Sequence, residues 1–218
     1  SLVYVNTGGN VAVIDAILLR QADVISLPGD PFIHQITIDP NGRFLFVGGP
    51  DPTIWVIDIR PDSPAFHTVL RTIPLPRARE PLSGLAVTNN GERLLVATGE
   101  RDDPFGYLSV FKLDPGNEPT LDDLAPNGWG GLEMDIPLAA VPMALAASPD
   151  KDHPDLVALT YRYRVSILAP DWSDSLPPQP QRIVTLDLSN PNPEPRAVIT
   201  KVQGGNLLAY GTDYYSGY

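Results

Sequence analysis

Cysteine is absent from the 218 residues, which excludes disulfides and thiolate metal sites. Basic residues are also scarce, because 15 Lys and Arg stand against 26 Asp and Glu and leave a net charge of −11. Each contact with a nucleic-acid phosphate needs a Lys or Arg to displace counterions, so nucleic acid is not an expected partner. An anionic membrane surface is disfavoured for the same reason. No cofactor-binding motif is present, and no cofactor is expected.

Long apolar runs and helical periodicity are missing as well. No run approaches the roughly eighteen residues that a membrane span requires, so we predict no membrane insertion. The first five residues already have a strand pattern and no signal-peptide pattern. The sequence therefore predicts a piece of a longer protein. The 25 prolines and 18 glycines are spread along the chain, which indicates frequent turns.

One unit recurs along the chain. Residues 35–47 align with residues 84–96, and each contains an alternating strand, an Asn-Gly pair and a second apolar strand. Asn-Gly suits a tight hairpin because both residues tolerate positive φ. Further copies start at residues 144 and 197, so the period is about fifty residues. A period of that length with four strands in each unit predicts an all-β fold of propeller blades.

Complete and partial blades account for the whole chain. The predicted boundaries are a partial blade at 1–30, blades at 31–76, 81–138 and 141–188, and a partial blade at 195–218, all within one incomplete propeller domain. Three strands precede residue 35 and match strands two to four of a blade, whereas two strands follow residue 197. Both ends then contain a second strand and do not complete each other. We expect the open edges to be covered by further blades of the parent protein or by another chain.

The first two units resemble a known repeat. Tyr4-Val5-Asn6, the Asn10–Asp15 strand, the Val24–Leu27 strand and the Asn41-Gly42 hairpin resemble the YVTN-type repeat of lactonase-like β-propellers. The resemblance weakens after about residue 150. It implies a parent propeller of seven or eight blades, and it implies an extracellular or cell-surface location. It does not imply a reaction.

His34 is the candidate catalytic residue of the lactonase alternative. Members of that branch resemble one another in a Pro-Arg-His motif at the start of an inner strand, whereas this chain has Pro31-Phe32-Ile33-His34. The Arg is missing, and the family His would fall at Gln35. A shift of one residue turns a strand side chain to the other face, which favours a structural role for His34.

The other titratable residues are dispersed. His67 is predicted to begin an outer strand and His153 lies in a polar turn, so neither has a partner at metal-ligand spacing. Asp102-Asp103 and Asp122-Asp123 lie in acidic loops that lack the spacing of a calcium loop. We interpret these as solvated turns, and no metal site is predicted.

Two aromatic features are candidate binding sites. One is the predicted hairpin Tyr161-Arg162-Tyr163-Arg164, because Tyr and Arg are favoured at interface centres. The other is Trp129, in the longest insertion, which is predicted either to cap the domain, to contact a ligand or to pack between blades.

Two functional hypotheses follow. The favoured hypothesis is a non-enzymatic propeller scaffold or binding module of a larger surface or secreted protein, which contacts a protein or glycan through its loop faces. The alternative is a fragment of a lactonase-like hydrolase, or of a redox-linked propeller, with its catalytic residues on other blades.

Overall fold

The computed structural model describes residues 1–29, 31–76, 82–100, 103–114, 129–138, 140–149, 156–161, 164–169, 181–187, 195–203 and 206–213. The regular elements of these residues are all β-strands. None of them forms a helix long and apolar enough to cross a membrane. Seventeen strands occur in five antiparallel sheets, which follow one another in chain order.

The sheets hold three, four, four, four and two strands. The first sheet contains β1 (Leu2–Asn6), β2 (Asn10–Asp15) and β3 (Arg20–Ser26). The second contains β4 (Gln35–Ile38), β5 (Phe44–Gly48), β6 (Thr53–Asp58) and β7 (Val69–Pro74). The third contains β8 (Leu82–Val87), β9 (Arg93–Glu100), β10 (Asp103–Lys112) and β11 (Leu132–Leu138). The fourth contains β12 (Ala144–Ala147), β13 (Val157–Tyr161), β14 (Arg164–Ala169) and β15 (Gln181–Asp187), and the fifth contains β16 (Pro195–Gln203) and β17 (Asn206–Asp213).

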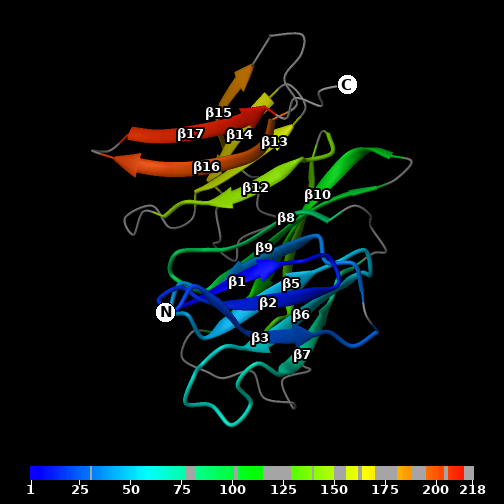
Figure 1. Ribbon diagram of the computed structural model, residues 1–218. Helices are drawn as coiled ribbons and strands as arrows, with labels where there is room; N and C mark the ends of the chain where they lie inside the picture. The colour runs from blue at the N-terminus through cyan, green and yellow to red at the C-terminus, as the bar shows by residue number, and fades with distance from the viewer. Residues whose placement is uncertain are drawn as a thin grey trace, which may run out of the picture.

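Each sheet packs face to face on the next. The inner strands lie side by side, with β4 against β8, β8 against β12 and β12 against β16. Three apolar clusters fill the spaces between the first four sheets. In Figure 1 the first sheet, in blue, and the fifth, in orange and red, lie at opposite ends of this row. Sheets that meet at their inner strands and are separated by apolar wedges form a β-propeller, as predicted.

The predicted Asn-Gly turns connect inner strands to second strands. Gly42 and Gly91 have φ of 66° and 74°, the left-handed region that glycine adopts without steric cost. Asp39 holds the first turn, because its Oδ1 accepts from the backbone N–H of Phe44 at 2.8 Å. The predicted strand-to-sheet pattern is confirmed in the described residues. The number of blades in a complete propeller stays a prediction.

Candidate functional site

His34 lies immediately before β4. Its backbone N–H donates to Gly48 O at 2.8 Å, so the main chain of His34 continues the pairing of β4 with β5. The His34 ring makes an edge contact with Phe32, with the centroids 5.6 Å apart. Within the described residues it has no carboxylate or hydroxyl partner that would make it a general base. The local geometry therefore favours the structural role over the catalytic one.

Tyr161 and Arg164 form the predicted hairpin of the fourth sheet. They are opposite each other in the register of β13 and β14. Tyr161 is half-buried and packs against the apolar cluster between the third and fourth sheets. Arg162 and Tyr163 lie outside the described residues. The hairpin is confirmed, and its use as a binding site stays a prediction.

Trp129 packs inside the protein. It is 5 % exposed and belongs to the cluster between the second and third sheets. Its ring stacks on Phe46 and meets Phe44 edge-on, at centroid distances of 6.2 and 5.7 Å. Arg71 covers the ring and donates to Trp129 O at 2.8 Å. Of the three predicted roles, this burial favours packing between blades, because the indole has little surface left for a ligand.

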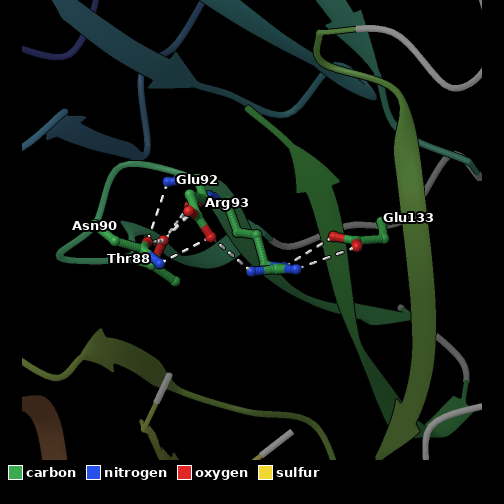
Figure 2. Close-up of polar contacts among 5 residues, drawn as sticks. All are labelled: Thr88, Asn90, Glu92, Arg93 and Glu133. Atoms are coloured by element: carbon green, nitrogen blue, oxygen red, sulfur yellow. Dashed lines mark hydrogen bonds and ion pairs between the residues drawn. The ribbon is translucent and has the colours of Figure 1, made fainter. Parts of the chain in front are cut away.

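Polar side chains of the third sheet form hydrogen bonds and ion pairs that stabilise its hairpin turn and its outer strand. Figure 2 shows Thr88, Asn90 and Glu92 in one network at the Asn-Gly turn, where the Thr88 hydroxyl donates to Asn90 Oδ1 at 2.7 Å. Arg93 reaches over β10 and pairs with Glu133 on β11, with Nε 2.9 Å from Oε2 (Figure 2). These groups are paired with one another and stabilise the sheet. No three His, Asp or Glu residues of the described part of the chain gather in a way that could hold a metal ion.

Tyr4, His67 and Asp23, which sequence analysis did not connect, form a hydrogen-bonded cluster between the first two sheets. His67 Nδ1 lies 2.6 Å from Asp23 Oδ2, and His67 Nε2 lies 3.2 Å from the Tyr4 hydroxyl. The His67 ring also stacks on Phe66 and meets Tyr4 edge-on. We call Tyr4, His67 and Asp23 the inter-sheet cluster, since Tyr4 and Asp23 come from β1 and β3 and His67 comes from the β6–β7 connection.

The predicted start of a strand at His67 is wrong. β7 begins at Val69, and His67 has a φ of 61°, which belongs to a turn. Its N–H donates to Asp58 O at 2.8 Å, and Thr68 O accepts from Asp58 N–H at 3.0 Å. These bonds close the connection between β6 and β7 and aim the ring at the first sheet. A sequence pattern does not reveal this, because the partners of His67 lie 44 and 63 residues away.

The protonation states of the inter-sheet cluster follow from its contacts. The hydrogen bond from His67 holds the pKa of Asp23 below its ordinary value, helped by the backbone N–H of Val24. Asp23 is therefore an ionised acceptor, and a proton on Nδ1 of His67 donates to it. Burial, and then the charge of Asp23, raise the pKa of Tyr4. The phenol is thus held protonated, which suits a structural link and opposes use as a nucleophile.

Substitutions at His67 should separate the side-chain contribution of the cluster from the backbone strain. We expect His67→Ala to lower the free energy of unfolding by about 1–2 kcal/mol, because a side chain only 8 % exposed loses two hydrogen bonds, one of them to the exposed Asp23 carboxylate. His67→Gly should be less destabilising than His67→Ala by about 1 kcal/mol, because glycine adopts φ of 61° without strain. Urea denaturation of both variants measures the difference. Equal losses would show that the positive φ stores no strain.

The first sheet has an apolar face that nothing in the described residues covers. In the second sheet, Leu45 and Val47 of β5 are buried against the first sheet, while Phe44 and Phe46 face the third. Val3 and Val5 of β1 occupy the places of Leu45 and Val47. They point away from the second sheet, and Val3, Val5 and Val24 are 47, 41 and 43 % exposed.

The apolar face continues onto β2. Ile14, which is half-buried, and Ala12, which is 8 % exposed, lie opposite Val3 and Val5 in the register. Asp15 Oδ1 accepts from the backbone N–H of Ile17 and Leu18 and holds the turn between β2 and β3. That turn displays three aliphatic side chains, those of Ile17, Leu18 and Leu19. We call Val3, Val5, Ala12, Ile14 and Val24 the outer face of the first sheet. An apolar sheet face with several exposed side chains indicates an interaction surface.

Comparison with known proteins identifies the fold and nothing finer. No family model matches the chain, and no curated protein matches it. Solved structures do match, among them a putative 6-phosphogluconolactonase from Bacteroides uniformis, with a TM-score of 0.63 and 8 % identity. The match covers 86 % of this chain and 52 % of that one, so this chain spans about half the length of the Bacteroides protein. The chain has the β-propeller fold.

Proposed function

We propose that this chain is a non-enzymatic β-propeller module that binds protein through the outer face of the first sheet, within a larger surface or secreted protein. One observation carries the proposal: three β-branched side chains of this face, Val3, Val5 and Val24, are 41–47 % exposed. The counterparts of Val3 and Val5 in β5 are Leu45 and Val47, which are fully buried against the first sheet. The partner is a further blade of the parent protein or another chain.

The chemistry of the outer face favours a protein over a glycan. A glycan presents hydroxyl groups, which lose free energy on burial unless they find hydrogen-bond partners. The five side chains of the outer face carry no polar atom. A second apolar β-sheet face gains free energy there, at about 25 cal/mol for each Å² of apolar surface removed from water.

The polar groups of the described residues also favour binding over catalysis. The carboxylates of Asp39 and Asp58 accept hydrogen bonds in turns and form ion pairs with the neighbouring side chains of Arg43 and Arg60. The inter-sheet cluster holds its phenol protonated. A hydrolase needs a base and a reactive group that converge on an open site, and these groups converge on each other instead.

A lactonase-like hydrolase is the second candidate. It is supported by the fold likeness to the Bacteroides protein, whose name includes a lactonase activity. At 8 % identity the likeness concerns the fold. His34 is the residue through which this candidate is testable.

The test compares surface variants of the purified chain. The double substitution Val3→Thr, Val24→Thr should reduce fluorescence of the apolar dye ANS severalfold, since threonine keeps the strand preference and adds a hydroxyl to the exposed face. Leu132→Thr, on the exposed side of the third sheet, is the matched control and should leave most of the signal. Unchanged dye binding in the double variant would remove the support for the outer face.

Lactone hydrolysis is the contrary outcome. Incubation of the chain with 6-phosphogluconolactone should give the spontaneous rate of ring opening. Catalysed hydrolysis that His34→Ala abolishes would overturn the binding-module proposal in favour of the hydrolase.

A further inference from the structure

β1 is an edge strand of the first sheet, whereas the corresponding strands of the next three sheets are paired on both sides. β5, β9 and β13 each lie between an inner strand and an outer one. β1 pairs with β2, and no described strand lies along its other edge. Edge strands with open hydrogen-bonding groups are templates for pairing with another strand.

The register shows which backbone groups of β1 are open. Thr7 N–H donates to Asn10 O at 3.0 Å, which makes this a hydrogen-bonded pair of the β1–β2 ladder. Such pairs alternate along an antiparallel ladder. The N–H and C=O groups of Leu2, Tyr4 and Asn6 therefore point to the uncovered edge, spaced for a second ladder.

The second sheet shows how that ladder is filled elsewhere. Phe44 O accepts from Asp39 N–H at 3.0 Å, and Gly48 O accepts from His34 N–H at 2.8 Å. Phe44 and Gly48 of β5 correspond to Leu2 and Asn6 of β1. Their carbonyl groups are thus hydrogen-bonded to residues that flank the inner strand β4. An antiparallel strand beside β1 would repeat this arrangement.

The exposed side chains of β4 indicate the same unfilled place, between β4 and the open edge of β1. Ile36 and Ile38 of β4 align with Leu85 and Val87 of β8. Leu85 is buried and Val87 half-buried, because β8 lies between β4 and β12. Ile36 is half-buried and Ile38 is 41 % exposed. β4 therefore has a covered side toward β8 and an uncovered side toward β1.

We propose that one extended strand of a partner polypeptide adds to the edge of β1 in antiparallel orientation and fills the place beside β4. This inference rests on the proposed function and specifies the partner. The main-chain groups of the added strand bond to Leu2, Tyr4 and Asn6. Its side chains alternate between two faces, of which one extends the outer face and the other contacts β4. Strand addition of this kind takes its affinity from main-chain hydrogen bonds and its specificity from alternate side chains. Aliphatic side chains fit, as in Leu85-Ala86-Val87 of β8.

The probe is a fluorescent peptide with the sequence of residues 82–90. We expect saturable binding by anisotropy, and in amide exchange measured by NMR we expect Leu2, Tyr4 and Asn6 to gain protection. Val3 and Val5, whose N–H groups already face β2, should show little change. Ala86 and Thr88 belong to the ladder with β9, since Thr88 N–H donates to Arg93 O. The peptide with Ala86→Pro should bind about tenfold more weakly. Proline has no N–H, so one main-chain hydrogen bond is lost and the neighbouring pairs of the ladder are strained.

The peptide with Val87→Pro is the matched control, because the N–H of Val87 points away from the ladder, and it should bind more tightly than the Ala86→Pro peptide. Equal binding of the two proline peptides would overturn strand addition. Protection of Leu2, Tyr4 and Asn6 in the monomer without peptide, or a peptide-free dimer, would also overturn it. If the peptide fails while Val3→Thr, Val24→Thr still lowers dye binding, strand addition falls and the proposed function stands. If the chain hydrolyses the lactone and His34→Ala abolishes this activity, the proposed function falls, whereas the result of the peptide experiment is unaffected.

Discussion

Gly84→Ala is expected to destabilise the protein by about 3 kcal/mol, although alanine usually costs less than glycine in a strand. Gly84 lies on β8, the inner strand of the third sheet, next to Leu145 on β12, the inner strand of the fourth. A Cβ at this position would lie 2.4 Å from Cβ and 2.8 Å from the backbone N of Leu145 on β12. The backbone of β12 is held by its own ladder with β13, so the two sheets must separate to admit the methyl group.

Gly48→Ala provides the matched comparison for Gly84→Ala. Its added Cβ would lie 2.7 Å from Leu82 Cδ1 and 3.0 Å from Ile54 Cδ1, which are ends of side chains that can rotate. We expect a loss of about 1 kcal/mol or less. Guanidinium denaturation of both variants measures the difference. Equal losses would contradict the close backbone approach of β8 and β12.

Asp58→Asn is expected to lower the free energy of unfolding by about 2–3 kcal/mol. The Asp58 carboxylate is fully buried and accepts from Arg60 Nη2 and from Ser63 Oγ, both at 2.6 Å. It also accepts from the backbone N–H of Arg60 at 2.9 Å. Asparagine has one carbonyl oxygen for these donors and places its amide N–H groups against the guanidinium. Because the same connection carries His67, the loss should extend to the inter-sheet cluster.

The pH dependence of stability should change in the same variant. Burial acts to raise the pKa of Asp58, but the hydrogen bonds from Arg60 and Ser63 and the charge of Arg60 outweigh it and lower the pKa. A lowered folded-state pKa stabilises the protein above the unfolded value of about 3.9, and this contribution is lost as pH falls through the folded value. Asp58→Asn should therefore flatten the acid side of the stability curve. Asp51→Asn, which removes an exposed carboxylate of the same sheet, is the control for the change in net charge.

Local residue patterns were sufficient to predict the strands and their grouping. The Asn-Gly pairs at residues 41–42 and 90–91 indicate hairpins because glycine accepts positive φ there, and Gly42 and Gly91 adopt it. The three-stranded pattern before residue 35 and the two-stranded one after residue 197 correspond to the first and fifth sheets. These features depend on neighbours within a few residues, so they are legible in a linear sequence.

The side-chain constellations were not predictable in the same way. Trp129 lies in an insertion, where sequence analysis left a ligand contact open, and its burial depends on Phe44 and Phe46 more than eighty residues earlier. One signal for the outer face was present. Val3 and Val5 repeat the alternation of Leu45 and Val47, which implies a neighbouring sheet, but whether that sheet exists is decided by packing.

The linear order of residues by itself determined that the chain forms antiparallel four-stranded units with a period near fifty residues, because hairpin turns and alternating side chains act over short distances. Tertiary structure alone decided that Tyr4, His67 and Asp23 meet, that Trp129 is enclosed, and that no described residue covers the outer face or the edge of β1. The reason is physical: burial and long-range hydrogen bonds depend on which sheet lies against which. That depends on the twist and stacking of whole sheets and not on any single segment.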